Sequence, residues 1–378
     1  MMRSSVLLAL ALVVAPAFSH ADAGWQAFLE SELIEARSQA GLPAIAALVQ
    51  IDGKIVAQAA IGVRALGHPD AVTVDDRWHI GSDTKAFTAT LIARLVERGV
   101  MRFDATLADS LPEMVQELDP KYHGVTVRQL LSSTAGLPTL TEEEEFPEFL
   151  AAIRAAKGVS AQRAAVVRKY LSMPPRFEIG EFHYSNLGYI VAGVIAEKKT
   201  GRRWEDLVRE EIFAPLAVEH AGFGAPGTPA RVDQPRGHRE AQSKLIPMDP
   251  ADPEADNPPA LGPAGTINIA LKDWARFAQD QLDGVHGRGK LLETQTYRTL
   301  HTPVADNYAL GWGVKLGPDG TPALLTHAGS NGYWLSEVRI LPNENAIVLV
   351  STNAMTDAAV KAVPGIGKAL SARLTQAR

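Results

Sequence analysis

Strand-like segments lie near both ends of this chain, with a long helix-rich region between them. Residues 44–51 and 55–63 are mainly apolar runs joined by Asp52-Gly53, a strong signal for a β-hairpin. Further strand-like runs follow far downstream, at residues 308–316, 323–327, 334–341 and 346–352. Because the first two runs leave no room for a crossover helix, the sheet begins antiparallel. The pattern predicts one mainly antiparallel sheet built from both ends of the chain.

Predicted helices flank and interrupt this sheet. Residues 25–40 and about 358–374 are expected to form helices near the two ends, and residues 271–282 another. Further helical patterns occupy the middle of the chain, at residues 151–156, 161–173, 187–200 and 203–212. We therefore predict the α/β (α+β) class, with a sheet domain formed by residues 24–100 and 264–378. Residues 101–263 are predicted to be a mainly helical insertion with long loops.

The first residues have the pattern of a secretory signal peptide. Arg3 supplies a positive charge, an apolar core follows from Val6 to Phe18, and small residues offer cleavage positions near residue 21. No later segment reaches the roughly 18 apolar residues that a spanning helix needs. We expect residues 1–21 to be removed and the protein to be exported, either to the periplasm or into the medium.

Composition excludes several classes of function. The chain has 378 residues and a net charge of −6, so it lacks the basic surface of a nucleic-acid-binding protein. Without any cysteine, it has no lipoprotein anchor, disulfide, cysteine nucleophile or Cys-based metal site. Its ten histidines show no His-Glu-x-x-His spacing. We expect no metal and no cofactor, and a peptide or other small molecule as substrate; the oligomeric state is open.

Ser82 and Lys85 are the first candidate catalytic pair. They lie three residues apart at the start of an apolar helical segment, so their side chains share one face. Gly81 before them permits a tight turn that leaves the Ser82 N–H free at the helix N-terminus. A buried lysine loses solvation, and its pKa falls toward the range where it accepts a proton. A Ser-x-x-Lys spacing occurs by chance about once in a chain of this size, so alone it favours an ordinary capped core helix.

Two further motifs follow in order. Tyr184-Ser185-Asn186 precedes a predicted helix; a buried phenol could pass a proton to a leaving group, and an asparagine could bind a substrate amide. The alternative is a tyrosine packed in a turn and an asparagine that caps the helix. His327-Ala328-Gly329 lies between strands, and Gly329 would let the strand edge approach a substrate so that the amide of Ser330 serves as an oxyanion donor. This last pattern also occurs elsewhere in the chain.

Together these motifs resemble the serine β-lactamase and penicillin-binding-protein-like family, in the branch with class C β-lactamases, DD-carboxypeptidases, D-aminopeptidases and family VIII carboxylesterases. The resemblance covers nearly the whole chain after the predicted signal peptide. Residues 129–138 look like the family's "LLSHTSGLP" segment, and Phe182 to Gly188 looks like its "F-x-YSN-x-G". Phe213 to Leu216 and Leu310-Gly311-Trp312 also fit.

The resemblance implies a β-lactamase/transpeptidase-like fold and a role for each matching residue. Ser82 would be acylated, Lys85 would be the general base and Tyr184 would assist proton transfer, whereas Asn186 would bind the substrate amide. The N–H groups of Ser82 and Ser330, next to Gly329, would form the oxyanion hole. His327 stands where class C β-lactamases usually have a lysine. Because a neutral imidazole holds a substrate carboxylate less firmly, we expect weaker turnover of β-lactams.

The expected activity is therefore that of an exported serine hydrolase that cleaves a peptide, amide or ester through an acyl-enzyme. Carboxypeptidase, D-aminopeptidase, esterase and weak β-lactamase activities remain open, as does a non-catalytic penicillin-binding sensor of the same fold. An α/β-hydrolase with Ser330 as nucleophile is disfavoured, because a strand pattern and not a helix follows that serine.

Overall fold

A computed structural model describes residues 20–141, 145–154 and 156–376. Residues 1–19 of the predicted signal peptide lie outside the described residues. In the part that is described, no helix is both long enough and apolar enough to cross a membrane.

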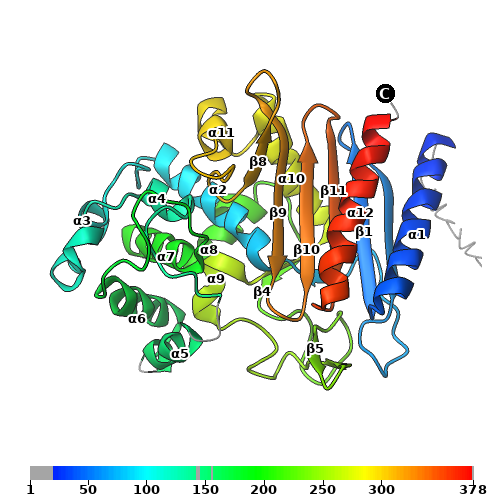
Figure 1. Cartoon of the computed structure of the whole chain (residues 1–378), viewed down its shortest axis with the longest axis horizontal. Helices are drawn as coiled ribbons and strands as arrows, with labels where there is room; N and C mark the ends of the chain where they lie inside the picture. Colours follow the sequence, from blue (N-terminus) through cyan, green and yellow to red (C-terminus); the bar gives the residue numbers. More distant parts are fainter. Residues whose placement is uncertain (1–19, 142–144, 155, 377–378) are drawn as a thin grey trace, which may run out of the picture.

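The main sheet has six strands in the order β2-β1-β11-β10-β9-β8, and every neighbouring pair is antiparallel. The first strand in the sequence therefore lies beside the last, and the second strand forms the edge next to the first (Figure 1). Ile45 of β1 pairs with Thr352 of β11, and Ile45 also pairs with Ile61 of β2. The strands are β1 (Ala44–Ile51), β2 (Lys54–Gly62), β8 (Gly313–Leu316), β9 (Pro322–Ser330), β10 (Leu335–Leu341) and β11 (Ala346–Thr352).

Helices cover both faces of this sheet. On one face α1 (His20–Ala40) and α12 (Asp357–Gln376) pack against Ile45, Val49 and the alternating residues of β11. On the other face Ala44, Ala46 and Leu48 join a larger core with α2 (Thr84–Glu97) and α10 (Leu271–Val285). Successive side chains along each strand point to opposite faces of the sheet, so they contribute alternately to two separate hydrophobic cores.

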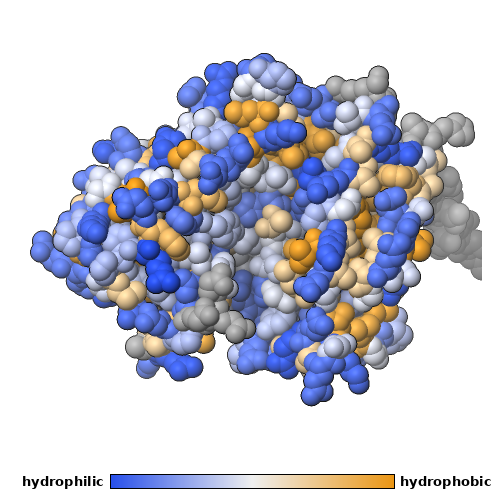
Figure 2. Space-filling model, viewed as in Figure 1, coloured by the Kyte–Doolittle hydropathy of each residue, from blue (hydrophilic) through white to orange (hydrophobic). Residues whose placement is uncertain are grey.

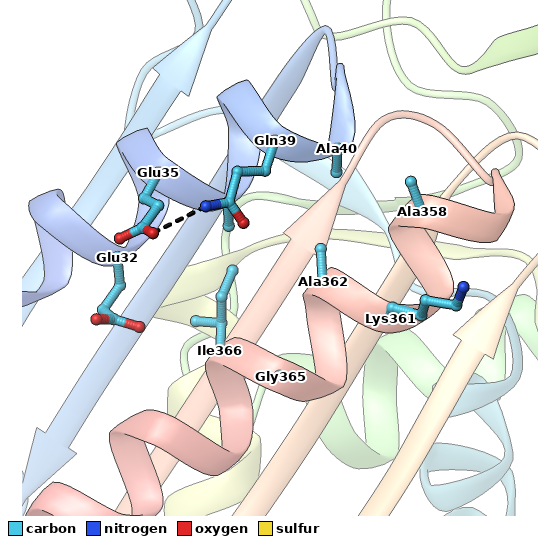
Figure 3. Close-up of a pocket in the computed structure, with 10 residues that line it drawn as sticks. Glu32, Glu35, Gln39, Ala40, Ala358, Lys361, Ala362, Gly365 and Ile366 are labelled. Atoms are coloured by element: carbon cyan, nitrogen blue, oxygen red, sulfur yellow. Dashed lines mark hydrogen bonds between the residues drawn. The ribbon is translucent and has the colours of Figure 1, made fainter.

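A groove of about 430 Å³ lies between α1 and α12 (Figure 3). Glu35 and Gln39 of α1 face small residues of α12 across it, among them Ala362 and Gly365. Since α1 and α12 cover the opposite face of the sheet from α2, this groove is remote from Ser82.

The middle of the chain is mainly helical and lies beside one end of the sheet (Figure 1). Its longest helix, α7 (Asn186–Thr200), is buried along most of its length. Its other helices are α3 (Leu107–Ser110), α4 (Val127–Leu131), α5 (Phe146–Arg154), α6 (Val159–Leu171), α8 (Trp204–Val208) and α9 (Gly262–Gly265), with α11 (Thr294–His301) farther along. Short strands form two minor sheets: β3 (Arg77–His79), β7 (Ile267–Ala270) and β4 (Ala221–Phe223) in one, β5 (His238–Ala241) and β6 (Lys244–Pro247) in the other.

The predicted fold class is confirmed: an antiparallel sheet is flanked by helices, and a mostly helical region interrupts it. The division into 24–100 plus 264–378 and 101–263 stays a prediction. The strand predicted at 308–316 is too long, since β8 begins only at Gly313. Gly311 has φ +81°, which no extended strand has, and its backbone packs against the Lys85 carbonyl. Tyr308 lies before the strand, and its side chain is buried.

Candidate active site

Ser82 lies in a single 3₁₀ turn, Gly81–Asp83, that leads directly into α2. The nearly all-apolar sequence after Lys85 buries this helix against its neighbours. Gly81 has φ +48°, so the turn uses the conformational freedom of glycine. In the space-filling view the surface is hollowed between the helical region and the sheet (Figure 2).

Lys85 is fully buried, and its Nζ lies within hydrogen-bond distance of three oxygens. It is 3.0 Å from Ser82 Oγ, 2.6 Å from Asn186 Oδ1 and 2.8 Å from the Ala264 carbonyl oxygen. Burial lowers the pKa of Lys85 well below its usual range. A neutral amine has two N–H groups, which can donate to the Asn186 side-chain oxygen and the Ala264 carbonyl oxygen. Its lone pair is then free to accept the hydrogen of the Ser82 hydroxyl. This arrangement suits Lys85 as a proton acceptor from Ser82.

Tyr184 lies above this pair from the segment before α7. Its ring centroid is 4.8 Å from Lys85 Nζ. Burial and the neighbouring Tyr308 raise the pKa of Tyr184 well above its usual range, and the Ser82 side chain opposes them. Tyr184 therefore holds its proton at neutral pH and is suited to pass protons rather than to act as the resting base.

Asn186 is the first residue of α7, where Ser185 caps the helix by accepting from the Gly188 N–H. Its side-chain oxygen accepts from Lys85, and its Nδ2 donates to the Leu140 carbonyl at 2.9 Å. The sequence predicts a substrate-binding residue here. In the structure, Asn186 holds the lysine amine in place.

His327 is buried on β9, and both of its ring nitrogens face protein groups. Nε2 is 3.3 Å from the Tyr308 hydroxyl, and Nδ1 is 3.0 Å from the Ala328 carbonyl oxygen and 3.6 Å from Asp83 Oδ1. Burial, with the charge of Lys85 adding to it, lowers the pKa of His327 to about 3. The imidazole is consequently uncharged at neutral pH, and it does not replace the positive charge of a lysine at this position.

Gly329 brings the end of β9 into contact with the turn that carries Ser82. A Cβ at Gly329 would overlap the Ile80 carbonyl oxygen and lie 2.7 Å from the Ser82 nitrogen. A Cβ at Gly81 would in turn overlap the Ser330 nitrogen. The backbone nitrogens of Ser82 and Ser330 thus lie on either side of a close contact between two glycines. Two N–H groups placed so can serve as an oxyanion hole.

The structure brings together all seven predicted site residues: Ser82, Lys85, Tyr184, Asn186, His327, Gly329 and Ser330. Ser330 ends a strand and is followed by a turn and β10, an arrangement that does not fit a nucleophile elbow. Among the described residues, no group of three or more His, Asp or Glu side chains is placed to hold a metal ion.

Three groups at the site were not predicted from the sequence. Tyr308 contacts Tyr184 and His327, the Ala264 carbonyl holds Lys85, and Asp83 is buried beside His327. Burial raises the pKa of Asp83 well above its usual range, while a hydrogen bond from Ser336 opposes this. Only Asp83 had a signal in the sequence: an acidic residue directly after the nucleophile, just before a mainly apolar helix.

Comparison with known proteins agrees with this geometry. The family model described as Beta-lactamase matches residues 29–370. "Penicillin-binding protein 4" of Amycolatopsis lactamdurans is 30% identical over 355 residues, covering 89% of this chain and 86% of that protein. The chain therefore belongs to the Beta-lactamase family. Members of this family are serine hydrolases, and this chain is one of them.

Solved structures show the same fold. The octameric penicillin-binding protein homologue from Pyrococcus abyssi has a TM-score of 0.73 at 23% identity, over 91% of this chain and 77% of that one. A D-stereospecific amidohydrolase from Streptomyces sp. has a TM-score of 0.67 at 23% identity, over 89% of this chain and 98% of that one.

Proposed function

We propose that this protein hydrolyses a peptide, amide or ester through an acyl-enzyme on Ser82. The observation that carries the proposal is the neutral-amine geometry of Lys85: two protein acceptors for its N–H groups and the Ser82 hydroxyl 3.0 Å from its nitrogen. The names of similar proteins, a penicillin-binding protein and a D-stereospecific amidohydrolase, support a substrate with a D-amino acid.

The proposed reaction has two halves. Lys85 takes the Ser82 proton while Oγ attacks the substrate carbonyl carbon, and the N–H groups of Ser82 and Ser330 stabilise the resulting oxyanion. The oxyanion collapses, the bond to the leaving group breaks, and the proton reaches the leaving group through Tyr184. Water then attacks the acyl carbon, its proton passes to Lys85 or Tyr184, and the Ser82 oxygen departs with a proton as the acid is released.

A substrate panel with mass spectrometry of the intact protein tests this function. We expect a fluorophosphonate and an activated ester to add one acyl or phosphonyl group to the wild type, and none to Ser82→Ala. Turnover should be measured with a D-Ala-D-Ala peptide, a D-amino-acid amide, p-nitrophenyl esters and nitrocefin. Labelling that persists in Ser82→Ala would refute the nucleophile.

The same panel distinguishes the proposed hydrolase from a second candidate function, that of a weak β-lactamase or a penicillin-binding sensor. The observation that favours weak β-lactam turnover is the uncharged, enclosed His327, which offers no cation to a substrate carboxylate. A stable penicillin adduct on Ser82 without turnover of any substrate would identify a sensor.

Export is also part of the proposal, and it is supported by the pattern of residues 1–21 alone. Expression of the full chain followed by fractionation and N-terminal sequencing tests it. A chain that starts near residue 22 in the periplasm or medium is expected. An uncleaved chain retained in the cytoplasm would contradict export.

A further inference from the structure

A buried histidine lies behind the Ser82 turn and is not used by the proposed reaction. His79 ends β3, and its side chain is completely buried. Its Nδ1 accepts a hydrogen bond from the Gly81 N–H at 3.1 Å. A ring nitrogen that accepts carries no hydrogen, so the hydrogen of the imidazole is on Nε2. That nitrogen lies 2.9 Å from Asp256 Oδ1.

Asp256 connects His79 with the other side of the oxyanion hole. Its side chain is 9% exposed, and it comes from the long segment between β6 and α9. The same Oδ1 accepts from Asn331 Nδ2 at 2.7 Å. Asn331 directly follows Ser330, and its own side-chain oxygen accepts from the Tyr333 N–H at 3.1 Å. One carboxylate oxygen therefore contacts both His79 and Asn331.

This arrangement controls the direction of both candidate oxyanion donors. The Gly81 N–H is fixed by His79, and the next amide along the chain is that of Ser82. Gly81 lacks a side chain and has φ +48°, so this hydrogen bond adds to the close contact with β9 in restricting rotation of the Ser82 amide. On β9 the turn after Ser330 is fixed by Asn331. An oxyanion hole needs its two donors about 3 Å from one point, so small rotations of either amide are costly.

We propose that Asp256 and His79 are positioning residues that hold the amides of Ser82 and Ser330 at a fixed separation. The inference rests on the proposed acyl-enzyme at Ser82. It assigns a function to the loop around residue 256, which none of the three predicted motifs includes.

The test uses the full chain and compares an oxygen ester with its sulfur analogue. Wild type, Asp256→Ala, Asp256→Asn and the control Glu254→Gln, an exposed residue on the same loop, are assayed with p-nitrophenyl butyrate and the matching thionoester. A thiocarbonyl sulfur is larger and accepts hydrogen bonds poorly, so it gains little from well-placed donors. Circular dichroism and thermal unfolding establish that each variant is folded.

Asp256→Ala is expected to lower kcat for the oxygen ester about 10–100-fold, with KM changed less than about twofold and a smaller loss for the thionoester. Asp256→Asn should recover most of the activity, because its amide oxygen can still contact His79 Nε2 and accept from Asn331 Nδ2. Glu254→Gln should equal the wild type. If Asp256→Ala does not fold, Asn331→Ala can replace it, because it removes the hydrogen bond to Asp256 at a partly exposed position. It should show the same fall in the ratio of kcat for the oxygen ester to kcat for the thionoester.

Parallel losses for the two esters, or full activity in Asp256→Ala or Asn331→Ala, would overturn the positioning role while leaving Ser82 acylation intact. If no ester, amide or penicillin acylates the wild-type protein, the proposed function is overturned, and the positioning role with it. The two failures are therefore distinguishable.

Discussion

Lys85 is in an environment that favours an uncharged amine, and this has consequences for both activity and stability. In the folded protein its pKa is lowered by burial, whereas in the unfolded chain the pKa is near the ordinary lysine value of 10.5. Between these two pKa values the unfolded chain binds more protons than the folded protein. Stability therefore rises with pH in that window, and it is reduced at neutral pH.

Replacement of Lys85 by methionine, an apolar side chain of similar length, should separate these effects. We expect Lys85→Met to lower the acylation rate of Ser82 about 10²–10⁴-fold, because the base is lost. The alkaline rise in the free energy of unfolding should also disappear. Stopped-flow acylation and urea unfolding at pH 7 and pH 9.5 measure the two effects.

Lys199→Met, an exposed lysine at the end of α7, is the matched control and should change neither quantity. Wild-type acylation in Lys85→Met would contradict the role of Lys85 as base. An unchanged alkaline rise would contradict its burial as an uncharged amine.

The residues of the proposed reaction could be predicted from the sequence more fully than the residues that position them. Ser82, Lys85, Tyr184, Asn186 and His327 come from three short motifs in a fixed order, and the structure places them together. Tyr308, His79 and Asp256 have no such motif. Tyr308 and Asp256 reach the site because strands or loops far apart in sequence pack together, and local sequence patterns carry no information on such contacts. His79 is close to Ser82 in sequence, but its contact with Asp256 likewise depends on long-range packing.

At the scale of elements, the close packing of β9 against the Ser82 turn is the constraint most open to test. Gly329→Ala should push the strand away from Ile80 and move the Ser330 amide. We expect kcat to fall about 10²–10³-fold, as for loss of one oxyanion donor, with KM little changed. Steady-state kinetics with circular dichroism would measure this.

Gly365→Ala is the matched control. A Cβ at Gly365 meets no atom within 4 Å, and this residue lies inside α12 at the remote groove of Figure 3. Alanine there should leave kcat unchanged and stabilise the protein by about 0.5–1 kcal/mol. Full activity in Gly329→Ala would show that β9 does not supply the second donor.

Strands and helices were predicted well where alternation or helical periodicity was strong, as for β1, β11 and α12. The error at β8 has a local cause. Residues 308–316 are apolar enough for a strand, but Gly311 packs against the start of α2 with a positive φ, and β8 begins only after it. The alternation of apolar and polar residues does not predict such a backbone conformation.

Across the whole molecule, three buried histidines make the fold sensitive to acid. Burial, the first cause in each case, lowers the pKa of His238 to about 4 and of His301 and His327 to about 3. Their unfolded values lie near 6.5, so the unfolded chain takes up these protons first as pH falls. Stability is lost below pH 6.5, by about 2–3 kcal/mol for each histidine at pH 4.5.

Urea unfolding between pH 7.5 and 4.5 checks this sensitivity. His301→Gln, remote from Ser82, should remove about one third of the loss that the three histidines cause. Its Gln281 partner can still be hydrogen-bonded by the new amide. An acid slope that is unchanged in this variant would show that His301 does not titrate as its burial implies.

The pairing of β1 with β11 also determines when the molecule can fold. Ala44 donates to the Asn353 side chain across 309 residues of sequence, and β1 lies between β2 and β11 in the sheet. A chain emerging from the ribosome therefore presents β1 and β2 as a lone hairpin, which is marginal in water, until nearly all of it has been synthesised. The nascent protein should stay open to chaperones and proteases throughout translation, and the nucleophile can meet its oxyanion strand only once the C-terminal residues arrive.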